Sequence, residues 1–233
     1  NSETDFVAKN EQFLHVLDVL QASLLETKPA SLEEALKVST PEGTVEEVIT
    51  NATATIGEKI SFRRIDVVEK KDDEIFGTYM HMGGKISAVV VLKGTQDAQI
   101  AKNIVIAADG ASDDAAKEAL TNIAMQVASM SPVYVSQSEI PSDVVEHERE
   151  LQMQMMQNDP KMAGKPEKVL QGILKGKVDK HFKDLCLNDQ EYFLEPKQKV
   201  SQFLKENGAE AVCFVRYQAG EGIEKKEENF AEE

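Results

Sequence analysis

Residues 74–94 read EIFGTYMHMGGKISAVVVLKG. This stretch holds two runs rich in branched and aromatic residues, 74–81 and 85–94, on either side of a Met-Gly-Gly turn. Such a pattern is typical of a β-hairpin. A similar run, ISFRRIDVVEK at 60–70, comes just before them across a Lys-Asp-Asp turn. Three neighbouring strands with such short connections predict an antiparallel meander.

Helical patterns surround these strands. Phe13, Leu17, Leu20 and Leu24, for example, recur at the spacing of one helix face. The fold class predicted is α+β, with two related subdomains of antiparallel sheet packed with helices. The relation rests on a weak echo of the 60–70 pattern in AVCFVRYQAGEG near the end of the chain. The helices are expected at 10–26, 31–38, 41–59, 97–108, 113–130 and 199–210, and a last strand at 211–222.

The composition changes after residue 141. SDVVEHERELQMQMMQ (142–157) and PEKVLQGILKGKVDKHFKDL (166–185) are two charged helices joined by a short loop containing Pro and Gly. They predict an inserted antiparallel helical hairpin, a short coiled coil. Its apolar stripes are expected at Val144, Leu151 and Met155 on the first helix and at Leu170, Leu174, Val178, Phe182 and Leu185 on the second.

These patterns divide the chain into four expected parts. They are a first core subdomain at 1–72, a second at 73–140 with 188–223, the helical hairpin at 141–187, and the start of a C-terminal module at 224–233.

The charge balance limits the classes of partner. Among 233 residues, 26 are Lys or Arg and 41 are Asp or Glu, which gives a formal charge of −15. This balance argues against direct nucleic-acid binding, which needs basic clusters to neutralise phosphates. No apolar run reaches the length of a membrane span and no signal peptide heads the chain, so neither membrane nor export is expected. Two distant cysteines, Cys186 and Cys213, indicate a reducing cytoplasm rather than a disulfide framework.

The motifs of common enzymes are missing from the sequence. It has no phosphate-binding G-x-x-x-x-G-K-[ST], no G-x-S-x-G and no H-E-x-x-H. The four histidines, His15, His81, His147 and His181, are scattered, which disfavours a metal site. We therefore expect no catalytic residues, no metal and no cofactor.

Several unusual features look like contact features instead. Asp5 and Phe6 stand just before the first helix. Thr4 and Asp5 can cap that helix, and Phe6 can pack back on it as a hydrophobic staple or project from a turn into a partner. The other candidates are Ile56 and Gly57 at a helix end, His81 at a strand end and Phe193 in EYFLEP. Each has a structural alternative: helix packing for the first two, turn capping for His81 and core packing for Phe193.

The opening NSETDFVAKN resembles the signature of bacterial elongation factor Ts, and the similarity continues in order to the end of the chain. It runs through IGEKISFRRI, GTYMHMGGKISAVVVLKG, IAMQVASMSP, FLEP and AGEGIEKKEENFAEE. The resemblance implies a guanine nucleotide exchange factor that binds elongation factor Tu with GDP, disturbs its Mg²⁺ and phosphate site, and promotes GDP release. It also implies the α+β core and the helical hairpin.

The resemblance assigns roles to the contact candidates. Phe6 would be the wedge that enters the GTPase, and Asp5 would fix the loop and contact the partner. Ile56, Gly57, His81 and Phe193 match further contact positions, although Phe193 stands where a smaller apolar residue is expected. The hairpin would then support a homodimer or a 2:2 complex.

Two departures from the family keep a second hypothesis open. The family's N-terminal helical domain is expected to be absent, and the segment near 97–120 is longer than the family pattern. The alternative is a non-catalytic, holdase-type partner that binds the GTPase without accelerating exchange. An enzyme is the third and least favoured reading. Measured GDP release would separate the first two.

Overall fold

The computed structural model describes residues 2, 4, 6–94 and 123–223. The chain divides into two compact units, one of residues 1–69 with 219–233 and one of residues 70–218. We call them the helical unit and the sheet unit. The α+β class predicted from the sequence is confirmed, because helices accompany antiparallel sheets throughout the described residues.

The helical unit packs two helices around a small apolar core. Helix α1 contacts α3, and the buried residues between them come mainly from these two helices. This core contains Val16, Leu20, Val45, Val48, Ile49, Ala52 and Ile60. The described elements are η1 (Val7–Lys9), α1 (Glu11–Thr27), α2 (Leu32–Lys37), β1 (Ser39–Thr40), β2 (Gly43–Thr44) and α3 (Val45–Ile56).

Side-chain caps fix where these helices begin. Helix α3 starts at a capping box in which Thr44 and Glu47 satisfy each other's backbone N–H groups. Helix α1 is capped by Asn10, whose Oδ1 accepts hydrogen bonds from the N–H groups of Gln12 and Phe13. Capping of this helix by Thr4 or Asp5 is therefore wrong. The single turn η1 separates those residues from α1, and Asp5 itself lies outside the described residues.

The sheet unit is built on three antiparallel strands in the order β3-β4-β7. The unit also contains the helical hairpin of α7 and α8 and a separate two-stranded sheet of β5 and β6. The elements are β3 (Glu74–His81), β4 (Ile86–Lys93), α6 (Ile123–Met130), η3 (Gln137–Glu139), α7 (Ser142–Gln157), η4 (Pro160–Met162), α8 (Glu167–Leu185), η5 (Leu187–Asp189), β5 (Glu191–Tyr192), β6 (Glu195–Lys199), α9 (Val200–Glu206) and β7 (Glu210–Gln218).

The strand predicted over 60–70, and with it the meander of neighbouring strands, is wrong. All of residues 60–70 are described, and none is paired in a strand. In the meander this segment would lie beside β3, whereas the third strand of the sheet, β7, lies on the other side at β4, pairing Val215 with Val89 and Phe214 with Val90. Adjacent apolar residues in β7 suit a strand with packing on both faces, whereas the charged Arg63 and Arg64 of the 60–70 segment bind the turn at Glu221.

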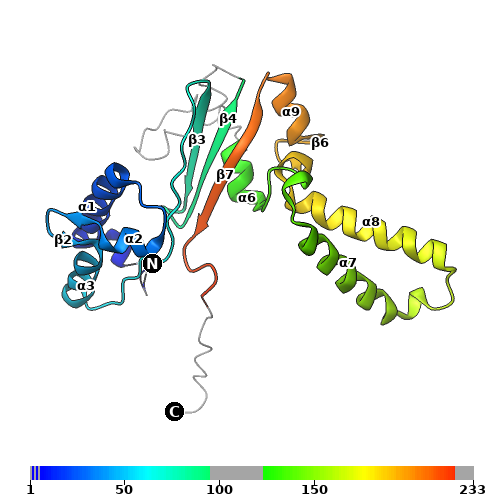
Figure 1. Ribbon diagram of the computed structural model, residues 1–233, viewed down its shortest axis with the longest axis horizontal. Coiled ribbons are helices and arrows are strands. Elements are labelled where there is room, and N and C mark those ends of the chain that lie inside the picture. The colour runs from blue at the N-terminus through cyan, green and yellow to red at the C-terminus, as the bar shows by residue number, and fades with distance from the viewer. Residues whose placement is uncertain (1, 3, 5, 95–122, 224–233) are drawn as a thin grey trace, which may run out of the picture. The chain divides into compact units, whose positions relative to one another are not determined.

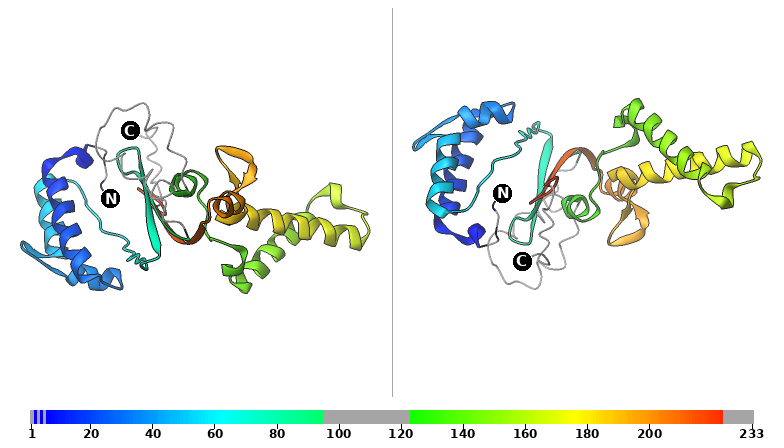
Figure 2. Two further views of the ribbon diagram at one scale, coloured as in Figure 1. Left: turned by 90° about the horizontal axis from the view of Figure 1, so that it is seen from above. Right: turned by 90° about the horizontal axis from the view of Figure 1, so that it is seen from below.

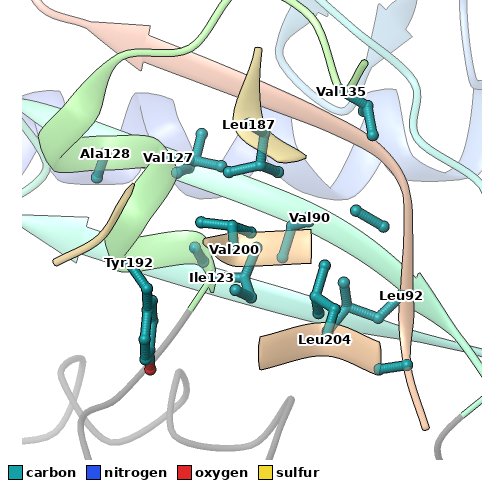
Figure 3. Packing of buried hydrophobic residues seen from close by; sticks show 14 residues of the cluster. Val90, Leu92, Ile123, Val127, Ala128, Val135, Leu187, Tyr192, Val200 and Leu204 are labelled. Atoms are coloured by element: carbon teal, nitrogen blue, oxygen red, sulfur yellow. The ribbon is translucent and has the colours of Figure 1, made fainter. Parts of the chain in front are cut away.

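The main core lies on the face of the sheet that α6 and α9 cover. Helix α6 contacts all three strands, and it lies against the sheet in Figures 1 and 2. Val90 and Leu92 of β4 meet Ile123 and Val127 of α6 and Leu204 of α9 (Figure 3). The helix predicted over 97–108 and the first part of that over 113–130 lie outside the described residues, and the rest of the latter is α6.

Helices α7 and α8 run side by side from a connecting loop (Figure 1). The inward face of α7 differs from the prediction. Glu148 and Met156 are its buried residues, while Leu151 and Met155 point to solvent. Buried Glu148 is accommodated because Gln152 donates to its Oε1 at 2.8 Å and His181 Nε2 lies 3.7 Å from its Oε2.

Both cysteines are free thiols, and their environments predict low reactivity. Burial, with Asp189 and Glu139 nearby, raises the pKa of Cys186 from 9.0 to about 11. Burial, with Glu74 and Glu139, also raises the pKa of Cys213. Because only the thiolate reacts readily, iodoacetamide at pH 8 should modify the native protein far more slowly than the urea-unfolded protein.

The same shift predicts a pH effect on stability. A thiol whose pKa is raised by folding stabilises the fold below its unfolded pKa, and that contribution is lost as pH rises through the folded value. The contribution of Cys186 should therefore disappear between pH 9.0 and about 11. Mass spectrometry of alkylated peptides and urea unfolding across this range are the measurements. Rapid native modification of Cys186 at pH 8 would contradict both expectations.

Candidate functional site

Phe6 is the most exposed large apolar residue that is described, with 85% of its surface open to solvent. Its backbone is nevertheless held in a turn. The carbonyl of Phe6 accepts the N–H of Lys9 at 3.2 Å, and the next residue, Val7, is buried with 3% exposed. The staple interpretation is wrong, because a ring packed on its own helix could not be this exposed.

The segment before Phe6 is attached to the end of α3. Thr4 donates two hydrogen bonds to the Glu58 carboxylate, from its backbone N–H to Oε2 at 2.9 Å and from its hydroxyl to Oε1 at 2.6 Å. These residues are 54 positions apart in the chain. Glu58 was not among the residues predicted from the sequence, since no local pattern pairs it with Thr4. The only available signal was its presence in the IGEKISFRRI motif.

Ile56 and Gly57 lie at this same end of α3. Ile56 is partly buried against the core of the helical unit. Gly57 is the C-cap and has φ 80°, a left-handed conformation that favours glycine. No atom lies within 4 Å of the position that a Cβ would take at Gly57. The contact between Thr4 and Glu58 therefore brings the Phe6 segment close to the Ile56–Gly57 turn.

His81 ends β3 at the tip of the β3–β4 hairpin, in the sheet unit. Its ring stacks on Tyr79 with 6.0 Å between centroids, and Nδ1 lies 3.1 Å from the Tyr79 hydroxyl. The turn that follows places Met82, Gly83 and Gly84 at positive φ, which reverses the chain tightly. His81 is exposed, and Met82 beside it is 63% exposed. The imidazole is thus oriented by its neighbour and open to solvent.

Phe193 is a core residue more than a surface residue. Its side chain is partly buried against the main core and meets Tyr192 edge to face. Its backbone N–H donates to Oε1 of the buried Gln126 at 2.9 Å. Phe193 directly follows β5, whereas His81 ends β3, so the two residues belong to different elements that are far apart in the sequence. The structure brings Phe6 toward Ile56 and Gly57 and places His81 and Phe193 in the sheet unit.

Neither a metal-binding cluster nor a membrane-spanning helix is found among the described residues. Among them, no three His, Cys, Asp or Glu side chains gather as a metal ion would require. No helix in these parts of the chain is long and apolar enough to span a bilayer. A surface hollow of about 890 Å³ is lined by charges of both signs, including Lys180, Lys183 and Asp184.

The described residues form an α+β scaffold that presents the exposed Phe6 and His81 at turns. A family model described as "Elongation factor TS" matches residues 3–221. The chain belongs to the elongation factor Ts family, and its general role is that of a translation elongation factor.

Proposed function

We propose that this chain binds the GTPase elongation factor Tu in its GDP form and promotes the release of GDP. The observation that carries the proposal is the exposed ring of Phe6 on a fixed turn. An apolar ring left in water between a buried Val7 and a hydrogen-bonded Thr4 is suited to enter a partner's surface. Phe6 would act as a wedge beside the Mg²⁺ and phosphate site, with Asp5 beside it.

The mechanism requires no chemical step. A factor that binds the GTPase more tightly without nucleotide must weaken nucleotide binding by the same factor, because coupling is reciprocal. Lowering the affinity of the GTPase for GDP a thousandfold requires about 4 kcal/mol of differential binding free energy. Burial of one Phe side chain supplies roughly 1.5–3 kcal/mol. Phe6 therefore needs other contacts to share this work.

The proposed additional contacts are Ile56, Gly57, His81 and Phe193. The turn at Gly57 supports a close approach, since a partner backbone would meet no side chain there. The exposed and oriented His81 suits a hydrogen bond to the GTPase. Phe193 is the weakest candidate, because its side chain already packs on the main core.

The proposal includes the setting in which the chain acts. We place it in the cytoplasm as a non-enzymatic partner of the GTPase, with no direct nucleic-acid or membrane contact. We further propose that the hairpin α7–α8 supports a homodimer or a 2:2 complex. Leu151 and Met155, one turn apart on the outer face of α7, are 44% and 54% exposed and would be the contact.

The test is release of a fluorescent GDP analogue from elongation factor Tu after addition of this chain. The expected result is release that accelerates with concentration of the chain and saturates. A complex that forms on size-exclusion chromatography without faster release would instead support the holdase-type alternative. If the chain neither binds elongation factor Tu nor accelerates GDP release, the exchange-factor proposal and the holdase-type alternative are both refuted.

A further inference from the structure

Glu58 joins two segments of the helical unit through Thr4. A carboxylate that accepts both an N–H at 2.9 Å and an O–H at 2.6 Å from one residue fixes that residue in position and orientation. Glu58 makes this contact just outside α3, immediately after the C-cap Gly57. The Glu58 carboxylate therefore binds the N-terminal segment through Thr4.

Both sides of this contact are anchored in the core. On the α3 side, the buried Ile60 donates its N–H to Thr53 Oγ1 at 3.2 Å, which fixes the segment that carries Glu58. On the other side, buried Val7 and the N-cap Asn10 fix the chain that follows Phe6. Phe6 is thus held from both directions, by Thr4 before it and by Val7 after it.

We propose that Glu58 is a positioning residue for the wedge: through Thr4 it holds the turn that presents Phe6. This inference rests on the proposed function. Without the contact, only the Val7 side of the turn would be anchored, and the Phe6 ring would lose its fixed direction. The partner would then have to order the segment on binding, which weakens association and exchange.

The test is GDP release from elongation factor Tu measured over a range of concentrations of variants of the 233-residue chain. Glu58→Gln keeps the side-chain volume and removes the charge. Thr4→Val removes the hydroxyl, and Thr4→Ser restores it. We expect Glu58→Gln and Thr4→Val each to reduce the exchange efficiency about three- to tenfold, with Thr4→Ser near the parent value.

Double variants separate positioning from direct contact. If Glu58 acts only through Thr4 and Phe6, Glu58→Gln should have little further effect in a Thr4→Val or Phe6→Ala background. If Glu58→Gln lowers the exchange efficiency by the same factor in the Phe6→Ala background as in the parent, the inference is overturned and Glu58 contacts the partner itself. Glu46→Gln, which removes an exposed charge from α3, the helix that Glu58 follows, is the matched control and should leave exchange unchanged.

The outcomes distinguish this inference from the proposed function. A parent chain that does not accelerate release refutes the function, and the inference falls with it. A parent chain that is active, with Phe6→Ala impaired and Glu58→Gln normal, overturns the inference alone. Amide exchange of residues 6–9 provides a partner-free check, since protection should fall in Glu58→Gln while the melting temperature stays within a degree or two of the parent's.

Discussion

Phe6→Ala should slow GDP release from elongation factor Tu roughly ten- to a hundredfold at a fixed, subsaturating concentration of the chain. The reason is the loss of roughly 1.5–3 kcal/mol of apolar burial that the ring would gain in the complex. The fold itself should not weaken, because the ring is 85% exposed and contributes little to the core. Stopped-flow release of a fluorescent GDP analogue measures the effect, and thermal unfolding checks the fold.

The matched control for Phe6→Ala is Leu25→Ala. Leu25 is also a large apolar side chain of the helical unit, 71% exposed, but it lies near the other end of α1. It should have almost no effect on release. If the two variants slow release equally, general surface hydrophobicity rather than a wedge would explain binding. If neither does, Phe6 has no part in exchange.

Gln126→Met should destabilise the protein by roughly 2–5 kcal/mol. Gln126 is buried in α6, where its amide donates to the Glu191 carbonyl at 3.0 Å and to Gln190 Oε1 at 3.2 Å. Its own Oε1 accepts the N–H of Phe193. Methionine of similar size would remove the buried hydrogen bond to Gln190 and the part-buried ones to the Glu191 carbonyl and the Phe193 N–H, at roughly 1–3 kcal/mol for each group that is left unsatisfied.

Urea unfolding of both proteins measures this loss as a lower midpoint with an unchanged slope. Gln154→Met is the control, since it makes the same substitution at an exposed position of α7 in the same unit. Its effect should be under about 0.5 kcal/mol. A loss of less than about 1 kcal/mol for Gln126→Met, which is roughly the lower limit for one unsatisfied group, would mean that water replaces the amide.

The sequence predicted the local elements well where their signals are local. The β-hairpin at 74–94, the helices of the hairpin and the helix before Gly57 all follow from side-chain period, turn residues and caps within one segment. The resemblance to elongation factor Ts also came from the sequence, and the family is confirmed over residues 3–221. One error is local: Asn10, and not Thr4 or Asp5, caps α1. Another is at long range: the 60–70 segment has strand-like residues, yet it is not paired in a strand, and the third strand of the sheet is β7, which pairs with β4.

For the candidate site, the sequence proposed residues but could not predict their environment. It singled out Phe6 and left open whether the ring packs inward or faces solvent. It also placed the inward face of α7 at Leu151 and Met155, because apolar spacing alone cannot recognise a buried carboxylate that has partners. Glu148 is buried there because Gln152 and His181 lie within reach.

By itself, then, the sequence determined the family, the α+β class and the position of most of the longer helices and strands. These properties depend on backbone preferences and on side chains within a few positions of each other. The tertiary structure decided the strand partner of β4, the exposure of Phe6, the burial of Gln126 and the contact between Thr4 and Glu58. Each of these joins residues far apart in the chain, so it exists only once packing has brought both groups together and removed water from between them.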